Sequence, residues 1–223
     1  MDPEVHNSLT RILGHAAPYE WAEVDRVDSV LVRFAKSVDG LSDLPRLGAL
    51  VLSAPDVTAI PDLADLPLLS ILEVSDSDVT DVRALTTATR LRDVSLLRNK
   101  ITDLVPVLDC ARLESLDVTG NPLSEDSYRR VLAELRDRGV RVVASQEREW
   151  RLTLALHAAG LPFSYYLGGD DRHLLSRPGV TRSPYPHVGH INVPPDELEH
   201  LLDHDPAGIE PLFDDPDRVL WHL

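Results

Sequence analysis

Residues 44–131 read, in lines of 22, LPRLGALVLSAPDVTAIPDLAD (44–65), LPLLSILEVSDSDVTDVRALTT (66–87), ATRLRDVSLLRNKITDLVPVLD (88–109) and CARLESLDVTGNPLSEDSYRRV (110–131). Four columns of these lines are aliphatic throughout: Leu47, Leu69, Leu91 and Leu113; Leu50, Leu72, Val94 and Leu116; Leu52, Val74, Leu96 and Val118; Val57, Val79, Ile101 and Leu123. Self-similarity at a fixed period of this length predicts a stack of repeats, because a single repeat cannot bury its aliphatic side chains alone.

The column order L-x-x-L-x-L-x-x-N-x-L resembles the leucine-rich repeat family, and the Thr-Asp pairs at 80–81 and 102–103 resemble its short 22-residue class. The resemblance covers about residues 22–144. It implies an α/β fold, a right-handed solenoid with a parallel sheet on its concave wall, and protein binding as its usual function. In the column where the family has an asparagine that bonds to neighbouring backbone, this chain has Pro55, Ser77, Asn99 and Asn121, so only the last two match.

The remaining sequence predicts a helical cap, residues 1–21, before the repeats, and a small α+β domain, residues 145–223, after them. Asp2-Pro3-Glu4 is typical of a helix start, and the spacing of Val5, Leu9, Ile12 and Leu13 predicts one apolar helical face, with Trp21 helping to close that end. Val30 and Val32 predict the strand of an irregular first repeat, 20 residues before Leu50 and Leu52.

The segment after the repeats carries a different pattern. A helix over 127–135 and a strand over 140–143 are expected to end the repeats. The C-terminal pattern then predicts a helix over 146–159, strands at 163–167, 173–176 and 190–193, and a helix that starts at Pro194-Pro195. These residues resemble no family that we recognise.

The net charge and the cysteine content limit which partners and which kinds of site the chain can have. The formal net charge of -15 repels phosphate backbones and anionic lipid, so it disfavours nucleic acid and membrane as partners and favours a basic protein. Alternatively, the acidity only keeps the chain soluble. The single cysteine excludes an intrachain disulfide framework and a cysteine-based zinc site.

The chain shows no leader and no long apolar run, which predicts a cytoplasmic protein, although a fragment that has lost its leader would look the same. Only two of 22 basic residues are lysine, a bias typical of a high-GC bacterial genome.

Candidate partner contacts follow from strand alternation, because the residues beside the buried columns point outward from the concave wall. This wall mixes carboxylates with exposed aliphatic residues, which suits a basic protein. The predicted contact residues are Ile71, Glu73, Asp76, Asp93, Ser95, Leu97, Arg98 and Asp117. The alternative is a solvated sheet face that binds nothing.

The C-terminal histidines offer a second kind of site. His200 and His204 are four apart on a predicted helix, a spacing that can place two imidazoles on one metal, but the stretch lacks the glutamate of H-E-x-x-H. His187 and His190 flank a predicted strand start. Ser164 and Ser176 are conceivable nucleophiles, but the chain has no G-x-S-x-G elbow and no phosphate-binding glycine loop.

The sequence therefore favours a non-catalytic protein-binding module without cofactor, and its size, charge and family resemblance suggest an immunity or inhibitor protein for a basic partner. Two alternatives stay open: a metal-dependent enzyme with its site in residues 145–223, and a scaffold whose C-terminal domain binds the partner.

Overall fold

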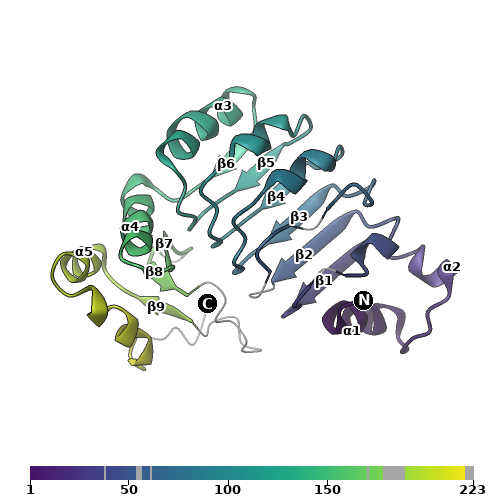
Figure 1. The fold of residues 1–223 in the computed structure, drawn as a ribbon, viewed down its shortest axis with the longest axis horizontal. Coiled ribbons are helices and arrows are strands. Elements are labelled where there is room, and N and C mark those ends of the chain that lie inside the picture. Colours follow the sequence, from purple (N-terminus) through teal and green to yellow (C-terminus); the bar gives the residue numbers. More distant parts are fainter. Residues whose placement is uncertain (38, 54–56, 61, 170, 178–188, 219–223) are drawn as a thin grey trace.

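The computed structural model describes residues 1–37, 39–53, 57–60, 62–169, 171–177 and 189–218. Six parallel strands form one sheet in the order β1-β2-β3-β4-β5-β6, and three antiparallel strands form a second sheet in the order β7-β8-β9. Figure 1 shows the six strands side by side along the inner side of an arc, with helical segments on the outer side. The expected α/β repeat fold is therefore present.

The strands of the large sheet fall on the aliphatic columns. Their bounds are β1 Ser29–Arg33, β2 Ala49–Ser53, β3 Ile71–Val74, β4 Asp93–Ser95, β5 Ser115–Asp117 and β6 Arg141–Val143. The register joins Val30 to Leu50, Leu50 to Leu72, Leu72 to Val94, Val94 to Leu116 and Leu116 to Val142. The shorter 20-residue step between the first two strands is thus confirmed.

Alternation along the strands separates the core from the outer surface. In β2 the side chains of Leu50 and Leu52 are buried, whereas those of Ala49, Val51 and Ser53 are partly exposed. The same columns are buried in every strand from β1 to β5, so each repeat contributes aliphatic side chains to one continuous core. Each buried aliphatic residue stabilises the stack by about 1.5–3 kcal/mol, and none is buried without its neighbours.

The two asparagines of the matching column connect successive repeats. The Asn99 amide nitrogen donates to the carbonyls of Val74 (2.7 Å) and Leu97 (3.1 Å), and its oxygen accepts from the Val79 amide (3.3 Å). One repeat later, the Asn121 amide nitrogen donates to the carbonyls of Leu96 (2.7 Å) and Val118 (3.0 Å), and its oxygen accepts from the Ile101 amide (3.1 Å). These side chains satisfy backbone groups that would otherwise be buried without partners. Pro55, the first residue of this column, lies outside the described residues.

Short helices carry the chain back on the outer side. The 3-10 helices are η1 Leu41–Asp43, η2 Arg83–Thr87 and η3 Val105–Asp109, and a π-helical turn, Ser127–Val131, continues into α3, Leu132–Asp137. The aspartates of the Thr-Asp pairs accept hydrogen bonds at the starts of η2 and η3, from the amides of Arg83 (2.9 Å) and Val105 (2.8 Å). These two aspartates therefore stabilise the turns that lead into the helices.

The N-terminal cap is α1 Pro3–Leu13, followed by α2 Trp21–Val24. Its first two turns cover β1: Val5 and Leu9 are buried, and the Ser8 hydroxyl donates to the Leu31 carbonyl (2.8 Å). Two expectations are wrong, because Ile12 is 47% exposed and Trp21 is 67% exposed. The first turns of α1 make the fully buried part of the closure, and Leu13, Tyr19 and Val24 pack partly buried against the same core.

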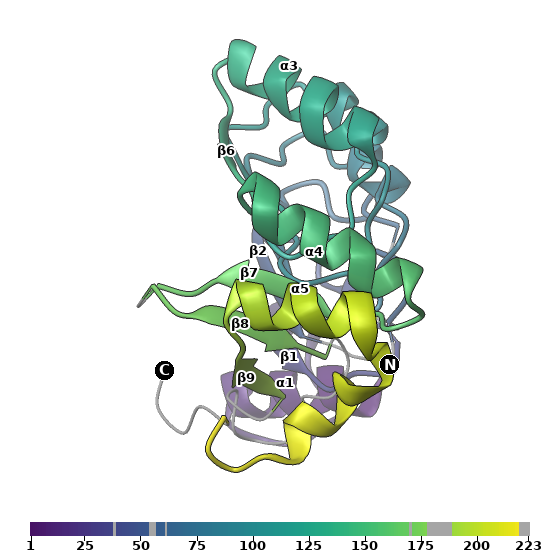
Figure 2. The same cartoon turned by 90° about the vertical axis from the view of Figure 1, so that its left-hand side faces the viewer.

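The C-terminal unit, residues 147–218, contains α4 Glu147–Ala158, β7 Ser164–Leu167, β8 His173–Ser176, β9 His190–Asn192, α5 Pro195–His204, η5 Pro206–Gly208 and η6 Glu210–Asp214. Its first helix belongs to both parts of the molecule. Trp150 lies in the core of the repeats, stacks on Tyr128 (3.9 Å between ring centroids) and donates to the Leu123 carbonyl (2.8 Å), whereas Leu156 lies in the core of the C-terminal unit. Figure 2 shows α4 between α3 and the small sheet.

Candidate binding face on the parallel sheet

The outward side chains of the large sheet form rows across the strands. One row joins Ala49, Ile71, Asp93, Ser115 and Arg141, and the next joins Leu31, Val51, Glu73, Ser95, Asp117 and Val143. We call the part of these rows on β3–β6 the outward face. Because parallel strands in register keep each row straight, residues 22 apart in sequence become neighbours in space.

A shallow hollow of about 270 Å³ lies in the outward face. Its lining consists of Ile71, Leu72, Glu73, Asp93, Val94, Ser95, Ser115, Asp117, Arg141 and Val143. Five of the eight predicted contact residues are among them, namely Ile71, Glu73, Asp93, Ser95 and Asp117. Whether a partner contacts them stays a prediction.

The carboxylates of the hollow differ in whether they already accept hydrogen bonds from the chain itself. Asp117 Oδ1 accepts from the Thr119 amide (3.0 Å) and hydroxyl (2.7 Å). Within the part of the chain that the structure describes, the carboxylates of Glu73 and Asp93 have no hydrogen-bond or ion-pair partner. Beside them, Ile71 and Val143 are 45% and 44% exposed. The hollow therefore combines uncompensated negative charge with exposed aliphatic surface.

Asp76 and Arg98, two further predicted contacts, bind each other. Arg98 Nε lies 2.6 Å from Asp76 Oδ1, Arg98 Nη2 lies 2.7 Å from Asp76 Oδ2, and their side chains are only 17% and 14% exposed. Burial disfavours the Arg98 cation, but the Asp76 carboxylate more than offsets this and raises the pKa of Arg98. Their contact with a partner stays a prediction, and their pairing leaves neither charge free.

The C-terminal unit covers this ion pair. The Arg98 guanidinium carbon lies 5.2 Å from the centroid of the Tyr166 ring, the Tyr166 hydroxyl lies 2.8 Å from His190 Nδ1, and His190 Nε2 lies 4.0 Å from Asp76 Oδ1. Burial raises the pKa of Tyr166 to about 12, so the hydroxyl remains protonated and shares this hydrogen bond with His190 Nδ1. We call Asp76, Arg98, Tyr166 and His190 the junction cluster.

The backbone allows this close approach. Asp76, Arg98 and Gly120 follow β3, β4 and β5 at 22-residue steps, and all three have positive φ, at 50°, 52° and 75°. A Cβ atom at Gly120 would lie 2.9 Å from Arg98 Cγ and 3.2 Å from Ser164 Cβ, so only glycine leaves room for the start of β7. The small sheet therefore packs against the loops at the strand ends.

Leu97, the last predicted contact residue, follows β4 outside the hollow and is partly exposed. Five lining residues were not among the predicted contacts: Leu72 and Val94 of the buried column, Ser115 on β5, and Arg141 and Val143 on β6. Extending the alternation rule to the last strand, which the sequence already indicated, would have found Arg141 and Val143.

The predicted metal pair lies on the surface of α5. The rings of His200 and His204 stack with centroids 4.4 Å apart, and His204 Nδ1 lies 3.0 Å from the His200 carbonyl oxygen. Among the described residues, no group of three histidine, cysteine, aspartate or glutamate side chains could hold a metal ion. His187 lies outside that part of the chain.

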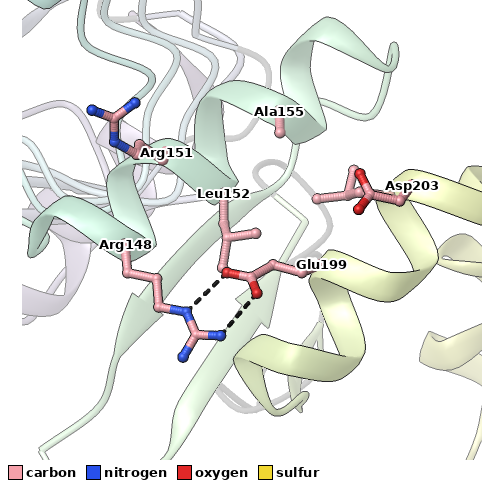
Figure 3. Close-up of a pocket in the computed structure, with 7 residues that line it drawn as sticks. Arg148, Arg151, Leu152, Ala155, Glu199 and Asp203 are labelled. Atoms are coloured by element: carbon pink, nitrogen blue, oxygen red, sulfur yellow. Dashed lines mark hydrogen bonds and ion pairs between the residues drawn. The ribbon is translucent and has the colours of Figure 1, made fainter.

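A second hollow, of about 310 Å³, lies between α4 and α5 (Figure 3). Its lining consists of Arg148, Arg151, Leu152, Ala155, Glu199, Leu202 and Asp203. Most of its charges are paired: Arg148 with Asp196 and Glu199, and Arg151 with Glu147. Compared with the outward face, this groove offers less unsatisfied charge.

Within the described residues, no helix is long and apolar enough to cross a membrane.

Comparisons with known proteins leave the family open. No family model matches the chain, and no curated protein sequence matches it. Three solved structures from Listeria monocytogenes are similar: internalin InlF, internalin C2 and the functional domain of InlJ, which includes a cysteine ladder. Identities are 17%, 16% and 15%, and TM-scores are 0.47, 0.45 and 0.34. Each match covers 69% of this chain. It covers 54% of the InlF chain, 80% of the internalin C2 chain and 45% of the InlJ chain, so this chain spans about half the length of InlF.

Proposed function

We propose that this chain is a non-catalytic module that binds a basic protein on its outward face. The observation that supports this most directly is the pair of carboxylates, Glu73 and Asp93, that stand without partners among the described residues beside exposed Ile71. Uncompensated charge next to exposed aliphatic surface contributes little to the stability of the isolated chain. Such a patch gains favourable contacts when a complementary protein surface covers it.

The net charge supports the choice of partner. At -15, the chain attracts a basic protein and accelerates its arrival, whereas it repels nucleic acid and anionic membranes. We infer that the chain is a cytoplasmic immunity or inhibitor protein that binds and neutralises a basic target protein. Ser164 and Ser176, the conceivable nucleophiles, are 0% and 1% exposed, so neither hydroxyl can reach a substrate in this conformation.

The test uses the immobilised full chain to capture partners from a lysate of the source cells, and mass spectrometry to identify them. The affinity of the purified partner is then measured for the wild type and for Glu73→Arg combined with Asp117→Arg. We expect this double variant to lose at least about 30-fold in affinity, the effect of removing a strong interface contact. Unchanged affinity would exclude the outward face.

A matched control separates contact from general electrostatics. Asp43→Arg combined with Asp65→Arg changes the net charge equally, and both of these residues are exposed away from the hollow. The control should bind almost as well as the wild type.

The scaffold alternative has its own variant. Leu202→Arg places a charge in the groove between α4 and α5 and leaves the outward face intact. If Leu202→Arg abolishes capture while the Glu73 and Asp117 double variant retains it, the binding function belongs to the C-terminal unit.

A further inference from the structure

Ser95 lies at the centre of the hollow, between two longer acidic side chains. It pairs in register with Glu73 on β3 and with Asp117 on β5, and Asp93 precedes it by two residues on the same side of β4. Adjacent strands are about 4.8 Å apart, so the three carboxylates surround the small serine at short range. The short side chain at this central position leaves the space that the hollow occupies.

Of the residues that line this space, only Arg141 is basic, so the chain neutralises the three carboxylates only in part. The carboxylates of Glu73 and Asp93 have no partner in the described parts of the chain, and the bonds of Asp117 to Thr119 use only its Oδ1 atom. An ammonium or guanidinium group above Ser95 would donate charge-assisted hydrogen bonds to several of these oxygens, and such bonds are about twice as strong as neutral ones. The central position therefore suits a lysine or arginine side chain.

The two sides of Ser95 differ, which gives the face a direction. Toward β1, the same row carries Val51 and Leu31, which is 41% exposed. Toward β6, Arg141 lines the hollow and donates to the Ser115 hydroxyl (3.0 Å). This cation repels a second basic group on that side. Val51 lies two strands, or about 10 Å, from Ser95, a distance that about two helical turns or three extended residues span.

We propose, on the premise that the outward face is the binding site, that it holds one lysine or arginine side chain of a partner segment over Ser95. The same segment places an aliphatic side chain about 10 Å away toward β1, over Val51. The face thereby selects a basic residue beside an apolar residue over a continuous run of basic residues.

The probe is a library of random 16-residue peptides displayed on phage, selected on the immobilised full chain. Enriched peptides are synthesised, and their affinities are measured by fluorescence anisotropy. We expect the enriched sequences to share one basic residue with an aliphatic residue about three or seven positions away, since those spacings match about 10 Å in a strand or a helix.

Three variants test the roles of the lining residues. Neutralising the acids with Glu73→Gln and Asp93→Asn should weaken the selected peptides about tenfold or more. Ser95→Leu fills the hollow without changing charge and should weaken them comparably. Arg141→Ser should shift the enriched sequences toward runs of basic residues. Asp43→Asn combined with Asp65→Asn is the control and should change nothing, and circular dichroism verifies that every variant folds.

Each outcome decides a specific claim. The inference is overturned if the peptides lack a common basic residue. It is also overturned if they bind the neutralised variant normally but lose binding with Ile71→Ser. In both cases the face binds apolar segments, and the proposed function stands. If no substitution on the outward face changes binding, both are overturned. Failure to enrich any peptide over the neutralised variant also overturns the inference.

Discussion

Glu73 and Asp76 are three residues apart in one repeat, yet the protein uses their carboxylates in opposite ways. Asp76 is 14% exposed, bound to Arg98 and covered by Tyr166 and His190, whereas Glu73 faces an open hollow without a partner in the described chain. The junction cluster therefore contributes to holding two parts of the chain together, and the outward face retains charge that does not stabilise the fold. An acidic residue in this repeat acquires its function from what covers it.

The largest effect is expected from breaking the buried pair. Arg98→Met removes the cation and strands the Asp76 carboxylate under the small sheet, which should lower the free energy of unfolding by about 3 kcal/mol, measured by urea denaturation. Arg92→Met breaks an exposed pair with Glu114 and should cost less than about 1 kcal/mol. Equal losses for the two variants would show that the junction cluster is not buried as described.

The asparagine ladder should show the next largest effect. Asn99→Ala leaves buried backbone groups of two repeats, including the Val74 carbonyl and the Val79 amide, without their partners, and should cost about 2 kcal/mol in the same measurement. Asn7→Ala, at an exposed hydrogen bond to Glu4, should change stability by less than about 0.5 kcal/mol. A loss at Asn99 as small as that at Asn7 would contradict the ladder.

A smaller effect distinguishes the open carboxylates from the buried one. Glu73→Gln combined with Asp93→Asn should leave the free energy of unfolding within about 0.5 kcal/mol of the wild type, because neither acid has a partner to lose among the described residues. Asp76→Asn should be clearly more costly, because it removes the charge that pairs with buried Arg98. If the two changes cost the same, the contrast between the two regions fails.

The smallest effect concerns an exposed pair at the other end of the molecule. The Ala16 carbonyl and the Glu23 carboxylate raise the pKa of His15, and the Glu20 amide and His15 lower the pKa of Glu23. His15 therefore stabilises the fold below its unfolded pKa, and this contribution disappears as the pH rises through its folded pKa. Glu23 stabilises above its unfolded pKa, and that contribution disappears as the pH falls through its folded pKa.

NMR titration of the ring protons measures this directly. The pKa of His15 should lie above that of an unfolded histidine and should fall in Glu23→Gln. His157 should shift the other way, since burial lowers its pKa. Shifts of the same sign in both histidines would refute the environments described for them.

Local rules account for much of the candidate site. The repeat period placed Leu50, Leu72 and Val94 on one buried column, and alternation placed Ile71 and Glu73 on its two outward flanks. These inferences succeed because parallel strands in register turn sequence spacing into spatial neighbourhood. They depend on nothing beyond the adjacent repeat.

The same rules do not separate Glu73 from Asp76 or buried Leu9 from exposed Ile12. That separation depends on which surface a distant segment covers, and residues 145–223 show no period that reveals their docking position. The sequence by itself determined the stacked repeats and the side of the sheet on which each residue stands, since both follow from chain-local geometry. Only the tertiary structure decided that the small sheet covers Asp76 and Arg98 and leaves Glu73 and Asp93 open, because burial by long-range packing depends on shape and charge across the whole chain.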